Sequence, residues 1–183
     1  EISSERLAEL RAAEARHSAL ASALRLLSYR PRTEGEMRDR LARKGAAPDV
    51  TEGAIDRLRE LRLLDDEAFS RSWVENRNLS SPRGRRLIAS ELRAKHVDRR
   101  VADSSVAAVD EQDAAYLACA RRARSLADLP WQDFRRRLGN FLLRRGFDHE
   151  TARAAIARTW GEVNGERPGT AEDPPKLPDE EAL

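Results

Sequence analysis

The chain of 183 residues contains an internal repeat with a period of about 50 residues. Gly45, His96 and Gly146 form one column of this repeat and lie 51 and 50 residues apart. Five further columns keep fixed offsets from these positions: Met37, Ile88 and Leu138; Leu41, Leu92 and Leu142; Lys44, Lys95 and Arg145; Val50, Val101 and Thr151; Ile55, Val106 and Ile156. Because such periods are typical of a supersecondary unit stacked on copies of itself, the repeat predicts three modules of one kind.

The modules are predicted to be helical. Val, Ile and Thr together number 16, whereas Ala and Leu number 51, and strands favour the first group while helices favour the second. Apolar residues recur at helical spacing, and Thr33, Pro48 and Asp65 or Asp66 stand where helices begin. The expected fold is all-α, an elongated array of three tandem three-helix modules with an extra N-terminal helix over residues 4–29.

The repeat also suggests boundaries. We expect an N-terminal helix in residues 1–29 that partly joins module 1, followed by module 1 in residues 30–79. Module 2 is expected in residues 80–128 and module 3 in residues 129–160. Residues 161–183 hold seven acids against two bases and lack periodicity, so we expect a disordered acidic tail there.

The charge is unevenly placed although the net charge is only +2. Residues 81–100 hold seven bases against two acids, and residues 121–158 hold ten against four. Arg outnumbers Lys by 31 to 3, and guanidinium groups bind phosphates and carboxylates through paired hydrogen bonds. This local basic density indicates a polyanionic partner, although a solvated charged face is the simpler alternative.

The sequence offers little material for catalysis. The histidines lie more than 50 residues apart, Cys119 is the only cysteine, and no glycine-rich phosphate loop occurs. Asp65, Asp66 and Glu67 are interpreted as helix-capping residues, and most aromatic residues, including Phe69, Trp73, Phe134, Phe141 and Trp160, as core; a base-stacking role for them is the alternative. We therefore expect no enzyme, no cofactor and no metal. The absence of a long apolar run or a signal-like start favours the cytoplasm and no membrane contact.

Two sets of motifs resemble the RecX family of bacterial regulators of the RecA recombinase. The first set consists of Leu64-Asp65-Asp66, Phe69, Trp73-Val74 and Arg77, followed by Gly84, Ile88, Glu91-Leu92, Lys95 and Val97. The second consists of Phe141-Leu142 and Arg144-Arg145-Gly146-Phe147. The resemblance covers about 140 residues, from Leu20 to Trp160. The chain departs from the family pattern at His96, where Gly is usual, and at Ser70, where Ala is usual.

The resemblance implies a non-enzymatic regulator that lies along the groove of RecA–DNA filaments. Such proteins inhibit the ATPase, strand-exchange and co-protease activities of RecA, and so modulate recombination, DNA repair and the SOS response. We expect a monomer that binds the RecA filament and, weakly, single- and double-stranded DNA. The candidate RecA- and DNA-binding residues are Arg43, Lys44, Arg77, Arg83, Arg85, Arg86, Arg93, Lys95, Arg99, Arg144 and Arg145. A stand-alone helical DNA-binding module and a scaffold for an acidic protein remain as alternatives.

Overall fold

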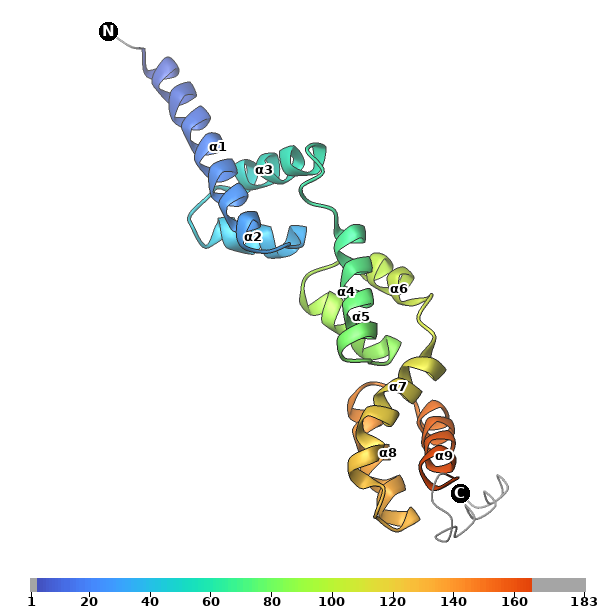
Figure 1. Ribbon diagram of the computed structural model, residues 1–183. Helices are drawn as coiled ribbons and strands as arrows, with labels where there is room; N and C mark the ends of the chain where they lie inside the picture. The colour runs from blue at the N-terminus through green and yellow to red at the C-terminus, as the bar shows by residue number, and fades with distance from the viewer. Residues whose placement is uncertain (1–2, 166–183) are drawn as a thin grey trace. The chain divides into compact units, whose positions relative to one another are not determined.

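The computed structural model describes residues 3–165, which form nine α-helices and one short 3₁₀ helix without any β-strand in this part of the chain (Figure 1). The elements are α1 (Ser4–Tyr29), α2 (Glu34–Ala42), α3 (Pro48–Glu60), α4 (Asp66–Ser80), α5 (Arg85–Ala94), α6 (Arg99–Val106), α7 (Glu111–Ala123), η1 (Arg124–Leu126), α8 (Trp131–Arg144) and α9 (His149–Gly165). The predicted all-α class is confirmed. Helix α9 includes residues 161–165, the first five of the predicted tail; the remainder, residues 166–183, lies outside the described residues.

The chain divides into two compact units. Unit 1 consists of Glu1–Trp73 with Glu91–Ser105, and unit 2 consists of Val74–Ser90 with Val106–Leu183. The division falls within α4 and α5, so each unit holds part of both helices.

The core of unit 1 is formed by α1, α2 and α3. Ala19 and Ala23 of α1 pack against buried residues of the other two helices, among them Met37, Leu41 and Ile55. The first half of α1, by contrast, is exposed along its whole circumference, since Ala19 is the first buried residue after Ser3. Residues from the apolar columns of the repeat therefore form much of the core of this unit, as predicted.

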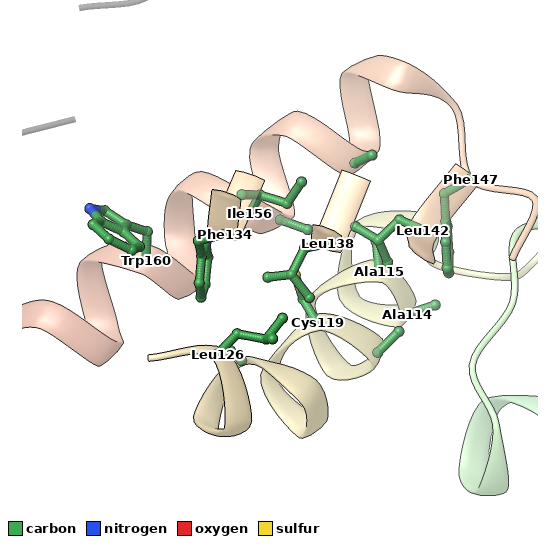
Figure 2. Packing of buried hydrophobic residues seen from close by; sticks show 14 residues of the cluster. Ala114, Ala115, Cys119, Leu126, Phe134, Leu138, Leu142, Phe147, Ile156 and Trp160 are labelled. Carbon is green, nitrogen blue, oxygen red and sulfur yellow. The ribbon is translucent and has the colours of Figure 1, made fainter. Parts of the chain in front are cut away.

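The core of unit 2 is formed by α7, α8 and α9. Figure 2 shows Phe134, Leu138 and Leu142 of α8 lying between α7 and α9. The Phe134 ring meets the edge of Trp160 at 4.8 Å between centroids, a geometry that aromatic pairs favour. Cys119 is fully buried in the same cluster.

The turn column of the repeat adopts one backbone conformation throughout. Gly45, His96 and Gly146 have φ values of 84°, 61° and 82°, in the left-handed region that glycine enters without strain. His96 is among the residue types that tolerate this region best, which explains how it replaces glycine there. Arg62, after α3, also has a positive φ, of 56°.

Two of these turns are packed against a glycine that precedes them by about 60 residues. A Cβ atom on Gly35 would lie 2.1 Å from the Cβ of His96, and one on Gly84 would lie 2.2 Å from the carbonyl oxygen of Gly146. Beside each contact, a carbonyl just before the turn accepts a hydrogen bond. Lys95 accepts from the Thr33 hydroxyl, and Arg145 accepts from the N–H of Gly84. We call these two contacts the joints; the first lies in unit 1 and the second in unit 2.

Candidate polyanion-binding surface

Five arginines gather in unit 2 and are called the arginine cluster: Arg77, Arg83, Arg121, Arg122 and Arg145. Burial lowers the pKa of Arg83, and the neighbouring charges of Arg77 and Arg145 lower it further. The pKa of Arg145 is lowered in the same way, by burial and then by Arg121 and Arg122. The shifts show that these guanidinium groups lie close enough to disfavour one another's charge.

Two arginines of the cluster, Arg121 and Arg145, are held in place by neutral groups. Arg121 donates hydrogen bonds of 2.8 and 2.9 Å to the carbonyl oxygens of Leu79 and Ser80. Arg145 donates to the Ser81 hydroxyl and the Pro82 carbonyl, both at 3.1 Å. Because a carbonyl or hydroxyl oxygen does not cancel a positive charge, these bonds orient the guanidinium groups and leave their charge uncompensated.

An aromatic ring supports two of the same arginines. The guanidinium carbons of Arg145 and Arg122 lie 4.5 and 5.0 Å from the centroid of the Phe141 ring. Such a cation–π contact fixes the plane of a guanidinium group while its N–H groups remain available to a further acceptor. Arg122 is exposed, and Arg145 is half-buried.

This arrangement suits an extended anion. Within its described residues, unit 2 carries 14 arginines against nine acidic side chains, so its net charge is positive. Oriented guanidinium groups bind phosphate or carboxylate through short, charge-assisted hydrogen bonds. An anion that brings several such groups at once would relieve the mutual repulsion of the cluster.

The structure places the predicted site residues in several different environments. Arg77, Arg83 and Arg145 lie in the arginine cluster. Arg85 donates to the Val109 carbonyl and lies 4.0 Å from Glu111. Arg93 and Arg99 both pair with Asp103, and Lys95 pairs with Glu36 at 3.2 Å. Arg43, Lys44, Arg86 and Arg144 are exposed and form no ion pair within residues 3–165.

Arg121 and Arg122 were missed as individual candidates. They lie on α7, outside the six columns of the repeat, and the motifs compared with RecX do not include them. The excess of bases in residues 121–158 was the available signal, but charge counts do not tell which arginines share a surface. Only the packing of α7 against the end of α8 brings them beside Arg145.

Other chemistry finds no support in the described part of the chain. No group of three or more His, Cys, Asp or Glu side chains in residues 3–165 is placed to hold a metal ion. Burial raises the pKa of the Cys119 thiol to about 11, against a smaller opposing effect of a hydrogen bond with Thr159, so this thiol is a poor nucleophile. Among the helices in these residues, none has the length and apolarity needed to cross a bilayer.

Comparison with known sequences gives matches along most of the chain. Family models for the first, second and third three-helix domains of RecX match residues 19–58, 65–105 and 110–156. The regulatory protein RecX of Mycobacterium sp. (strain JLS) is 38% identical over 154 residues, covering 80% of this chain and 82% of that protein. RecX of Chlorobium limicola is 31% identical over 145 residues, covering 79% and 91%.

Comparison with solved structures gives the same fold. A crystal structure of RecX from Lactobacillus salivarius superposes with a TM-score of 0.73 at 21% identity, covering 80% of this chain and 97% of that one. A second crystal structure of a regulatory protein RecX gives 0.70 at 23% identity, covering 84% and 78%. The predicted array of three tandem three-helix modules and the predicted resemblance are confirmed: the chain belongs to the RecX family.

Proposed function

We propose that this protein binds RecA–DNA filaments along their groove and inhibits the ATPase, strand-exchange and co-protease activities of RecA. It would thereby modulate recombination and the SOS response, acting without a cofactor. Membership of a family whose members are named regulatory protein RecX supports this role. The observation that carries the proposal is the arginine cluster, in which neutral groups orient Arg121 and Arg145 without cancelling their charge.

A nucleoprotein filament presents the kind of anion that the cluster suits. DNA phosphates recur at fixed spacing, and a filament adds carboxylates of the protein at a fixed distance from them. Single arginines gain little from one exposed partner, but several pre-oriented arginines gain together when the anion is itself ordered. We therefore expect binding to the filament to be stronger than binding to bare DNA.

A stand-alone DNA-binding module is the second candidate. The positive charge of unit 2 favours it, since phosphate contacts alone supply most non-specific DNA affinity. Such a module would bind bare DNA as tightly as it binds a filament. Its affinity would also fall steeply with salt, in proportion to the number of phosphates contacted.

The test compares the full chain on RecA filaments and on the same single-stranded DNA without RecA, each at two salt concentrations. The cluster variant is Arg121→Ala/Arg122→Ala, and the matched control is Arg135→Ala/Arg153→Ala, which removes two exposed arginines elsewhere in unit 2. We expect the cluster variant to lose filament affinity by about tenfold or more, and the control to lose little. Equal losses in both variants, or equal affinity for filament and bare DNA, would favour the second candidate.

A further inference from the structure

Unit 1 contains a groove of about 570 Å³, and none of its lining residues belongs to the arginine cluster. Its walls come from the α1–α2 connection, the α3–α4 connection, the first half of α4 and the side chain of Lys95. The volume is in the range of small-ligand sites. The groove combines a flat aromatic surface with positive charge.

The aromatic surface is formed by Phe69 and Trp73, one turn apart on α4. Their ring centroids are 5.9 Å apart and their planes differ by 17°, so the two rings lie nearly parallel. Both side chains are half-buried, although the sequence pattern predicted core positions. The Trp73 Nε1–H donates to Glu91 at 2.9 Å. The Lys95 ammonium lies over both rings, 4.5 Å from the Trp73 centroid and 5.8 Å from the Phe69 centroid. The indole is therefore held in a fixed orientation before any ligand binds.

Five charged side chains line the groove: Arg30, Arg32, Arg62, Lys95 and Asp65. Arg30 and Lys95 both pair with Glu36, so the positive charge available to a ligand comes from Arg32 and Arg62. Arg32 donates to the carbonyl of Leu26, and its pKa is lowered by burial first and then by neighbouring Arg30. Within residues 3–165 neither Arg32 nor Arg62 forms an ion pair with a carboxylate. Arg62 also holds a positive φ of 56°, a conformation that non-glycine residues adopt at some cost and that recurs at ligand sites.

From this combination we propose that the groove binds one unpaired nucleotide of a single-stranded nucleic acid. The base stacks on the Phe69–Trp73 surface, and its phosphate is bound by Arg32 and Arg62. Parallel aromatic rings favour a flat ligand, and base stacking on such rings is sequence-tolerant. An acidic peptide would satisfy the arginines but would leave the flat surface covered only by aliphatic side chains. The inference deepens the expectation of single-stranded DNA binding by naming a site for it, and it requires neither RecA nor a filament.

The test uses the full chain and two fluorescently labelled oligomers of equal length, oligothymidylate and its abasic counterpart, which share every phosphate and differ only in the bases. We expect oligothymidylate to bind at least about fivefold more tightly. It should also quench part of the tryptophan fluorescence, and that part should be absent in a Trp73→Phe variant. Phe69→Leu, which keeps apolar volume but removes the ring, should reduce the preference for bases.

Charge variants test the phosphate contact. Arg62→Gly removes the guanidinium group at a position where glycine fits the backbone, and it should weaken the binding of both oligomers severalfold. Arg71→Ala, which changes an exposed residue of α4 outside the groove, is the matched control and should change neither affinity. Circular dichroism of each variant verifies that the helices are intact.

Two results would overturn the inference. One is equal affinity for the two oligomers in the unchanged chain; the other is an acidic peptide that quenches Trp73 when oligothymidylate does not. Either result leaves the proposed function standing if the chain still inhibits RecA. Conversely, tighter binding of oligothymidylate than of the abasic oligomer, without any effect on RecA, would support the nucleotide site in the groove and refute the proposed function.

Discussion

The backbone N–H of Gly84 donates a 2.9 Å hydrogen bond to the carbonyl of Arg145, and Gly84 lies directly against the turn that follows. A related contact occurs about 50 residues earlier, where the carbonyl of Lys95 accepts from the Thr33 hydroxyl and Gly35 lies against His96. The basic residue before each of these two turns, Lys95 or Arg145, is thus part of a joint. Its counterpart Lys44, in the first copy of the repeat, is exposed, and nothing lies within 4 Å of a Cβ built on Gly45.

Replacing Gly84 by alanine is expected to destabilise unit 2 by about 1–3 kcal/mol. The added Cβ would lie 2.2 Å from the Gly146 carbonyl oxygen, so the backbone would have to shift. Gly53→Ala is the control, since a Cβ there meets nothing and a helical glycine weakens α3; this change should stabilise by about 0.5–1 kcal/mol. Urea unfolding followed by circular dichroism measures the stability of both variants. An unaltered midpoint for Gly84→Ala would contradict the close packing of Gly84 against the Gly146 turn.

Gly35→Ala is expected to destabilise unit 1, and His96→Gly is expected to rescue it in part. The Cβ added at Gly35 would meet the Cβ of His96 at 2.1 Å, whereas the next contact, with the His96 carbonyl, is at 3.0 Å. A double-mutant cycle separates this clash from the contact between His96 and Asp39. If Gly35→Ala lowers stability equally in the parent chain and in the His96→Gly variant, Gly35 and His96 are not coupled.

Arg144 and Arg145 are expected to behave differently although they are neighbours with the same charge. Arg145→Ala removes two hydrogen bonds and a contact with Phe141, so we expect a loss of about 1–2 kcal/mol in unfolding free energy. Arg144 is exposed and without such contacts in the described chain, and its alanine variant should stay within about 0.5 kcal/mol of the parent. Thermal unfolding of the two variants measures this difference. Equal stabilities would show that Arg145 does not stabilise the fold.

Acid is expected to weaken unit 1 through Glu34. A hydrogen bond from Arg59 lowers the pKa of this carboxyl below its usual value, more than burial raises it, and Arg38 adds to the effect. The stabilisation is therefore present above the unfolded-state pKa and is lost as pH falls through the lower, folded-state pKa, from about pH 5 downward.

The Glu34→Gln variant tests the direction of this pH dependence of stability. The variant should be less stable than the parent at pH 7, and the difference should shrink on acidification. The free energy of unfolding, measured by urea titration at several pH values, reports it. Glu52→Gln is a useful comparison, because Glu52 also pairs with Arg38 but is more exposed. A stability difference for Glu34→Gln that does not depend on pH would show that the ion pair is not its cause.

Much of the fold follows from local patterns in the sequence. The predicted first helix matches α1, and Thr33 caps α2 by accepting from the N–H of Glu36, as its spacing to that residue indicates. The left-handed turn at His96 follows from the two glycines in its column. The first two features depend on neighbours a few residues away and the third on the repeat, and a sequence displays both directly.

Other features depend on which helices pack together, and periodicity does not fix this. The repeat predicts modules that begin at residues 80 and 129, and these boundaries stay a prediction; the family models for the second and third domains match from residues 65 and 110. A period gives the spacing of a unit but not its starting point. The same limit applies to Arg121 and Arg122, which join the arginine cluster only through tertiary packing, and to Phe69 and Trp73, whose helical spacing does not reveal a half-exposed face.

The most direct test of the proposed function is RecA's hydrolysis of ATP on single-stranded DNA, titrated with this protein while DNA is in excess. We expect hydrolysis to fall at near-stoichiometric or lower amounts of the unchanged chain. Arg121→Ala/Arg122→Ala should require about tenfold more protein, and the Arg135→Ala/Arg153→Ala control should act like the parent. Unchanged hydrolysis throughout the titration, together with tight binding to bare DNA, would contradict a filament regulator and identify a DNA-binding module instead.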